Sequence, residues 1–184
     1  MTDATDRGTL LGIARDAIDA HVTGSSRMRT ATGDLALRPR GAFVTIHHRG
    51  ELRGCIGHIE ADSPLVRVIA QCAVAACSSD PRFPPVDAGE LPDIDVELSV
   101  LGPLEPILRP DEIDIGRHGL LVSRASRRGL LLPQVATERN WDALTFLAQA
   151  CRKAGLPADA WKNGASLWRF DAEVFGEVTD PASV

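Results

Sequence analysis

The chain alternates between segments with helical and with strand-like spacing of hydrophobic residues. Over residues 6–22 apolar side chains recur every three or four positions, which predicts an amphipathic first helix. Two apolar runs, 41–47 and 52–59, flank His48-Arg49-Gly50-Glu51 and predict a β-hairpin. Residues 93–100 alternate strictly between apolar and polar, which is typical of a half-buried strand in an antiparallel or mixed sheet.

A second helix is predicted to begin near Ser63. The Ser63 side chain can cap free backbone N–H groups, and Pro64 suits the first helical position. The helix should end near Ser79, because the proline-rich segment 80–85 cannot continue it. That segment holds Arg82 and Phe83 in a rigid loop, where they can form the wall of a site or simply stop the helix and plug the core.

The second half of the chain predicts further elements. Residues 119–133 read as a hairpin with a basic tip at 123–128, which can hold a phosphate or be a solvated turn. A third main helix over 141–154 is expected to be capped by Asn140. Apolar residues in 165–178 predict final strands.

Composition and charge exclude several classes of protein. The chain has 184 residues, 44% hydrophobic and 24% charged, as expected for one soluble domain. Its net charge of −5 and 4% aromatic residues oppose nucleic-acid binding. No apolar run is long enough to span a membrane, and the N-terminus lacks the features of a secretory signal, so a cytoplasmic location is expected.

The segment Leu52-Arg53-Gly54-Cys55-Ile56-Gly57 is the strongest candidate for a site. If it is extended, Arg53 and Cys55 face the same way, and a cation near a thiol favours the reactive thiolate. Gly54 and Gly57 mark places where a ligand or another backbone can come close. The alternative is that Cys55 is an ordinary buried cysteine, as the helical stripes predict for Cys72 and Cys151.

The same segment resembles the signature of the AMMECR domain family. Five further blocks resemble successive blocks of that family, in the family's order: 80–85, 97–101, 115–120, 131–136 and 153–157. Together the match extends over about residues 10–177. The resemblance implies an α+β fold, with two lobes around a cleft into which the signature faces. We therefore expect one such domain over residues 6–180, with about three main helices and short termini at 1–5 and 181–184.

The resemblance also implies a functional context. Prokaryotic members of this type are labelled protein A of the AmmeMemoRadiSam system, so a Memo-type protein and a radical SAM protein are the expected partners. The substrate, a small molecule or a protein, stays open, and fold similarity does not fix chemistry. No cofactor is expected from the sequence.

Three functional hypotheses follow from these residues. In the first, an enzyme or enzyme component uses Cys55 as nucleophile or thiol ligand, with Arg53 and Arg82 as anion contacts and His118 as a candidate base. Phe83, Gly54 and Gly57 would then border the substrate. The second is a metal site, but its residues match no standard ligand spacing: His47, His48, Cys55 and His58. In the third, the chain is a non-catalytic binding or scaffold protein, with Cys55 buried and Arg53 holding a loop through backbone carbonyls.

Overall fold

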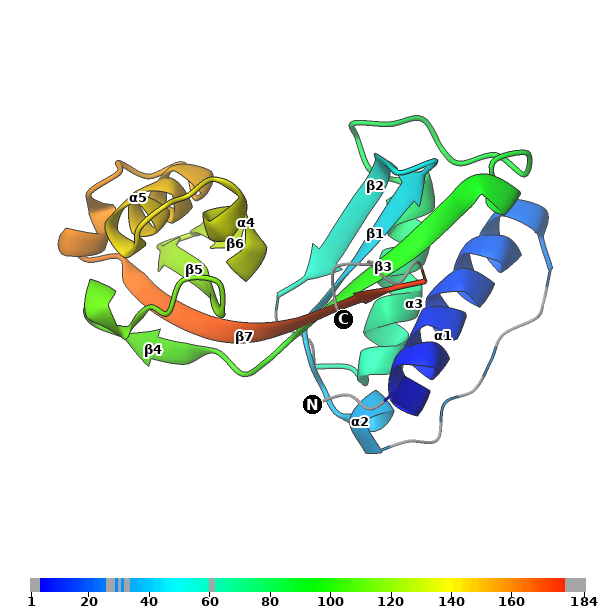
Figure 1. Cartoon of the computed structure of the whole chain (residues 1–184), viewed down its shortest axis with the longest axis horizontal. Helices are drawn as coiled ribbons and strands as arrows, with labels where there is room; N and C mark the ends of the chain where they lie inside the picture. Colours follow the sequence, from blue (N-terminus) through cyan, green and yellow to red (C-terminus); the bar gives the residue numbers. More distant parts are fainter. Residues whose placement is uncertain (1–3, 26–28, 30, 32–33, 60–61, 178–184) are drawn as a thin grey trace. The chain divides into compact units, whose positions relative to one another are not determined.

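The fold is α+β, as predicted. The structure, a computed structural model, describes residues 4–25, 29, 31, 34–59 and 62–177 (Figure 1). The chain divides into two compact units: unit 1 comprises Met1–Val100 with Glu173–Val184, and unit 2 comprises Leu101–Ala172. All strand pairs recorded for the described residues are antiparallel.

Unit 1 combines two long helices with a sheet in the order β2-β1-β3. Its elements are α1 (Ala4–Thr23), α2 (Asp34–Leu37), β1 (Ala42–His48), β2 (Glu51–His58), α3 (Leu65–Ser78), a 3-10 turn η1 (Leu91–Asp93) and β3 (Ile94–Leu101). The predicted first helix, hairpin, second helix and alternating strand are all present. Arg49 and Gly50 both have positive φ angles, 52° and 84°, which makes the tight turn between β1 and β2.

The core of unit 1 lies between the helices and one face of this sheet. Alternate residues of β1 and β3, such as Val44, Ile46, Val96 and Leu98, are buried against apolar stripes of α1 and α3. The residues between them point to the opposite face of the sheet, and Thr45 of β1 is one of these. Gly54 of β2 is buried toward α3, so Arg53 and Cys55 belong to the opposite face.

Unit 2 builds a second core on the rest of the chain. Its elements are β4 (Glu105–Ile107), η2 (Pro110–Glu112), β5 (His118–Arg124), β6 (Arg127–Leu131), α4 (Pro133–Glu138), α5 (Ala143–Lys153), η3 (Ala160–Lys162) and β7 (Ser166–Gly176). Strands β7, β5 and β6 are neighbours in that order, and β4 pairs with β7. Phe146 and Leu147 of α5 are fully buried against Leu120 and Val122 of β5. The end of β7 belongs to unit 1, where Phe175 joins the core.

Both predicted helix caps are wrong. The N-cap of α3 is Pro64 rather than Ser63, since Pro64 has an extended ψ of 142° and its carbonyl accepts the first helical hydrogen bonds. The N-cap of α5 is Asp142, whose carboxylate accepts from the Thr145 backbone N–H at 2.7 Å. Asn140 instead has φ of 51°, a left-handed conformation that asparagine tolerates.

Other differences concern short elements. The sequence pattern did not reveal α2, β4 or α4, which have three to six residues and too little periodicity to detect. The strands of the β5–β6 hairpin extend into the predicted basic tip and leave only Ala125 and Ser126 between them. The predicted final strands are one long strand, β7.

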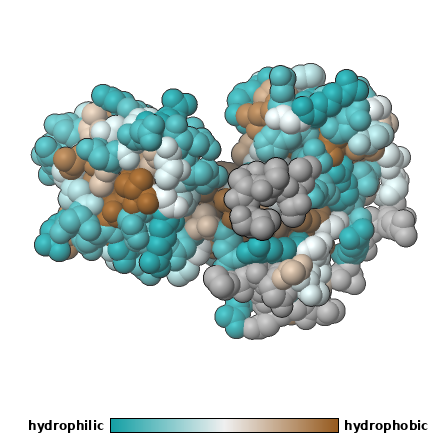
Figure 2. All heavy atoms as spheres, in the orientation of Figure 1, coloured by the Kyte–Doolittle hydropathy of each residue, from teal (hydrophilic) through white to brown (hydrophobic). Residues whose placement is uncertain are grey.

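The surface is mainly polar. Figure 2 shows hydrophilic residues over most of the face in view, with small apolar areas between them. None of the helices in the described residues combines the length and the apolarity that a membrane span requires.

Candidate functional site

Arg53 anchors the proline-rich loop to β2 in unit 1. Its Nε and Nη2 atoms donate to the two carboxylate oxygens of Glu90 at 2.7 and 2.9 Å. Nη1 donates to the carbonyl of Pro84 at 2.8 Å, and Nη2 to that of Pro85 at 3.2 Å. The side chain is only 13% exposed. Its hydrogen bonds lower the pKa of Glu90, so this ion pair stays formed at neutral pH.

Asp80 is the centre of a second, adjoining network. Its buried carboxylate accepts the backbone N–H of Cys55 at 2.9 Å and that of Arg82 at 3.1 Å. The Arg82 guanidinium donates to the same carboxylate through Nε at 2.9 Å and Nη2 at 2.6 Å. These donors, the Arg82 side chain first among them, hold the pKa of Asp80 well below its usual range.

The Asp80–Arg82 pair occupies the free edge of β2 at Cys55. Strand β2 is the end strand of the unit 1 sheet, so within the described residues Cys55 has no neighbouring strand on that side. Asp80 accepts its N–H, and Nη2 of Arg82 lies 3.5 Å from its carbonyl oxygen. The two side chains therefore take the place of a neighbouring strand and fix the backbone of Cys55.

Cys55 is the least buried of the four cysteines in the chain. Cys55 is half-buried, whereas Cys72, Cys77 and Cys151 are buried. Its Sγ atom accepts a hydrogen bond from Thr45 Oγ1 at 3.3 Å, across the β1–β2 register. Burial raises the pKa of Cys72 and of Cys77 to about 11, so those two thiols stay protonated. The predicted core positions of Cys72 and Cys151 are confirmed.

The two signature glycines each allow another part of unit 1 to come close. A Cβ atom on Gly54 would lie 2.3 Å from the carbonyl oxygen of Ala76 in α3. One on Gly57 would lie 2.3 Å from the ring of Phe43. The close approach that a strand glycine predicts is thus made at both positions by the protein itself.

Phe83 lies against Arg53 of the signature and Arg82 of its own loop. Its ring centroid is 5.4 Å from Cζ of Arg82 and 6.0 Å from Cζ of Arg53, within the range of cation–π attraction. The ring is half-buried and does not belong to the buried core cluster of unit 1. Phe83 therefore links the two arginine networks at the surface of the loop.

The metal hypothesis has no support in the geometry. Within the described part of the chain, no three or more histidine, cysteine, aspartate or glutamate residues are grouped so that they could hold a metal ion. His48 instead lies 4.0 Å from the Glu90 carboxylate, beside the Arg53 ion pair.

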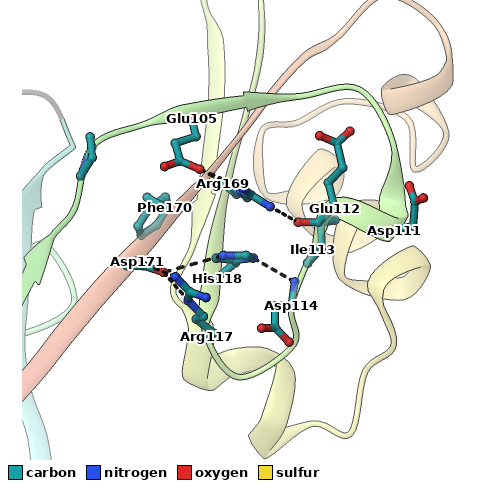
Figure 3. Close-up of a pocket in the computed structure, with 11 residues that line it drawn as sticks. Glu105, Asp111, Glu112, Ile113, Asp114, Arg117, His118, Arg169, Phe170 and Asp171 are labelled. Atoms are coloured by element: carbon teal, nitrogen blue, oxygen red, sulfur yellow. Dashed lines mark hydrogen bonds and ion pairs between the residues drawn. The ribbon is translucent and has the colours of Figure 1, made fainter.

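His118, the third predicted catalytic residue, belongs to a separate environment in unit 2. It begins β5, and its Nδ1 atom accepts the backbone N–H of Asp114 at 2.9 Å (Figure 3). Nε2 faces Asp171 Oδ1 at 3.8 Å, and Asp171 is paired with Arg117. Because Cys55 lies in unit 1, the pairing of its thiol with His118 stays a prediction.

Sequence reasoning did not identify three residues that organise the signature: Asp80, Glu90 and Thr45. For Asp80 a signal existed, because an aspartate two residues before an arginine can accept that arginine's N–H and pair with its side chain. For Glu90 the sequence contained no such signal, since Glu90 lies 37 positions from Arg53 in an irregular segment. Thr45 was placed on a strand but not paired with Cys55.

Comparisons with known proteins agree with the resemblance seen in the sequence. The AMMECR1 family model matches residues 11–175. A protein of Methanothermobacter thermautotrophicus is 47% identical over 178 residues, covering 92% of this chain and 93% of its own length. One from Methanococcoides burtonii is 43% identical, over 97% and 92%. The crystal structure of an uncharacterized protein from Pyrococcus horikoshii superimposes with a TM-score of 0.81 at 38% identity, covering 91% of this chain and 89% of that one.

Proposed function

The chain belongs to the AMMECR1 family, and we propose that it is an enzyme or enzyme component of a modification pathway with Memo-type and radical SAM partners, with Cys55 as its reactive group. One observation carries this proposal. Cys55 is half-buried in a chain whose other cysteines are buried, and hydrogen bonds hold both its sulfur, through Thr45, and its backbone N–H, through Asp80. A thiol that is reachable and held in one position suits nucleophilic chemistry.

The cation of this site is Arg82 rather than Arg53. The Arg53 guanidinium makes four hydrogen bonds to Glu90 and to two loop carbonyls, so it is committed to the fold. The Arg82 side chain is 52% exposed, and Asp80 engages only its Nε and Nη2 atoms. Arg82 can therefore contact an anionic group of a substrate next to Cys55 while its ion pair stays intact.

Thr45 supplies a hydrogen bond to the sulfur. Its hydroxyl donates to Sγ at 3.3 Å, which orients the thiol and can stabilise negative charge that develops there. In this scheme the Cys55 thiol loses its proton to solvent, and its sulfur bonds to an electrophilic atom of the substrate while the bond from that atom to a leaving group breaks. Thr45 orients the sulfur, and Arg82 holds the substrate. Whether that substrate is a small molecule or a protein is left to experiment.

The reactivity of Cys55 can be measured directly. We expect iodoacetamide at pH 7 to alkylate Cys55 in the full chain at least about tenfold faster than N-acetylcysteine. Cys72, Cys77 and Cys151 should stay unmodified, because their thiols are buried and protonated. Mass spectrometry of peptides sampled between pH 6 and 9 gives the rate at each cysteine, and Cys55→Ser is the control for assignment. If Cys55 is alkylated no faster than N-acetylcysteine, the proposed role of Cys55 as a nucleophile is wrong.

A scaffold role is the second candidate, and a specific observation favours it. The signature residues Arg53, Gly54 and Gly57 all have structural partners within unit 1: Glu90 and the loop carbonyls, the α3 backbone, and Phe43. The signature can thus be explained in large part by the need to hold β2, α3 and the loop together. In the scaffold role, the surface of unit 1 around the signature would bind the Memo-type or the radical SAM partner.

The two roles differ in what Cys55→Ala does. The alanine side chain is smaller and keeps the backbone hydrogen bond to Asp80, so the fold and the binding of partners should persist. If Cys55 is the nucleophile, we expect binding of the Memo-type or radical SAM protein to be retained and the reaction of the combined proteins to be lost. Retention of both binding and reaction would establish the scaffold role instead. Binding is measured by pull-down with purified partners, and the reaction by mass change of the product.

A further inference from the structure

Unit 2 contains a polar cavity that has His118 in its lining. Its volume is about 470 Å³, in the range of small-molecule sites, and all of its lining residues belong to unit 2 (Figure 3). We propose that this cavity binds a small cationic ligand of the aminoacyl class, in which an ammonium group stands next to a carbonyl oxygen. The inference is independent of the chemistry at Cys55.

His118 supplies a hydrogen-bond donor to the cavity. Its side chain is only 8% exposed, and the N–H of Asp114 donates to Nδ1, so the proton of the neutral imidazole is on Nε2. Asp171 Oδ1 is 3.8 Å from Nε2, beyond hydrogen-bond distance. Among the described residues no fully buried side-chain nitrogen lacks a partner, so Nε2 is not fully buried, and His118 is one of the residues that line the cavity.

The state of the imidazole is consistent with this role. Burial lowers the pKa of His118, and the nearby Arg169 lowers it further. The ring is therefore neutral at pH 7 and presents one N–H to the cavity. Such a group can donate a hydrogen bond to an oxygen atom of a ligand.

The charge of the lining opposes a ligand that is an anion. Two guanidinium groups line the cavity, Arg117 and Arg169, and both are already paired with carboxylates. Carboxylates outnumber them: Glu105, Asp111, Glu112, Asp114 and Asp171. The resulting negative potential favours a ligand with positive charge.

Asp114 is connected with both features of the cavity, the N–H donor of His118 and the negative charge of the lining. Its backbone N–H fixes the His118 ring, and its exposed carboxylate lines the cavity, where its charge acts on Arg117 and His118. A hydrogen-bond donor and an exposed carboxylate thus belong to two lining residues whose backbone and ring are in contact. A ligand that satisfies both needs an acceptor oxygen close to an ammonium group, which is the arrangement in an amino acid amide or at the N-terminus of a peptide.

Binding can be tested with three small probes on the full chain. L-lysinamide carries the ammonium groups and the carbonyl, hexanamide carries only the carbonyl, and glutarate is an anion. In a ¹H–¹⁵N NMR titration at pH 7, we expect L-lysinamide to shift the amide signals of Asp114 and Arg117 and the Nε2 signal of His118 in a saturable way. Hexanamide and glutarate should bind at least about tenfold more weakly.

A matched pair of variants locates the effect. Asp114→Asn removes the exposed carboxylate but keeps the backbone N–H to His118, and it should weaken the binding of L-lysinamide at least about tenfold. Glu138→Gln removes the same charge from an exposed position of unit 2 that does not line the cavity, and it should leave the affinity unchanged. The proposal is overturned if L-lysinamide causes no saturable shift, if either other probe binds equally well, or if the two variants weaken binding equally.

Discussion

Replacing Asp80 by alanine is expected to lower the free energy of unfolding by about 3 kcal/mol. The Asp80 side chain is 3% exposed and accepts four N–H groups, from the Cys55 and Arg82 backbones and from the Arg82 guanidinium. Alanine leaves the two backbone donors without an acceptor, and the free edge of β2 loses the group that replaces a neighbouring strand. Urea unfolding followed by circular dichroism measures the change.

The effect of Asp80→Ala should depend on pH in one direction. The pKa of Asp80 is lowered in the folded protein, so the unfolded chain binds its proton first as the pH falls. The stabilisation is complete above the unfolded value of 3.8 and is lost as the pH falls from there toward the lowered folded value. The difference between wild type and variant should therefore be constant from pH 7 to 5 and shrink between pH 4 and 3.

A second aspartate provides the matched control for this prediction. Asp111 is 67% exposed and pairs with an exposed arginine, Arg109, at 3.4 Å. Asp111→Ala should change stability by less than about 0.5 kcal/mol. Equal losses from both variants would mean that the Asp80 network does not stabilise unit 1.

Local patterns in the sequence were sufficient for the main elements of the fold. The alternation of apolar and polar residues in β3, and the helical spacing of apolar residues in α1 and α3, each indicate within a few residues which side of the element faces the core. Helix ends were less predictable. Ser63 and Asn140 are good capping residues by type, but contacts with other segments determine where the helix begins. The N–H of Leu65 donates to the carbonyl of Arg38, which holds Pro64 at the end of the helix.

The candidate site shows why contacts distant in sequence were missed. The two-residue period of a strand places Arg53 and Cys55 on one face, but it says nothing about the groups that each side chain meets. Glu90 draws the Arg53 guanidinium to the loop, and Asp80 reaches the Cys55 backbone from 25 positions away. An arginine with a carboxylate and two carbonyls within reach will satisfy its donors there.

Replacing Gly54 by alanine is expected to destabilise the protein by about 3 kcal/mol, because the added methyl group has no room. Its Cβ would lie 2.3 Å from the carbonyl oxygen of Ala76, a backbone atom of α3 that cannot rotate away as a side chain can. Strand β2 or helix α3 must then move, and the hydrogen bonds that position Cys55 and Arg53 move with them. Thermal and urea unfolding measure the loss, and alkylation of Cys55 reports the displacement of the site.

The matched control is Gly8→Ala in α1. Gly8 is an exposed helical residue. Apart from its chain neighbours and the backbone of its own helix, no described residue lies within 4 Å of the place that an added Cβ atom would take, so alanine should stabilise the helix by about 0.5 to 1 kcal/mol. The same substitution is thus expected to have opposite signs at the two glycines, since one removes backbone freedom in open space and the other forces two packed backbones apart. A neutral or stabilising Gly54→Ala would show that β2 and α3 are not held in contact there, and the fixed position assigned to the Cys55 thiol would lose its structural basis.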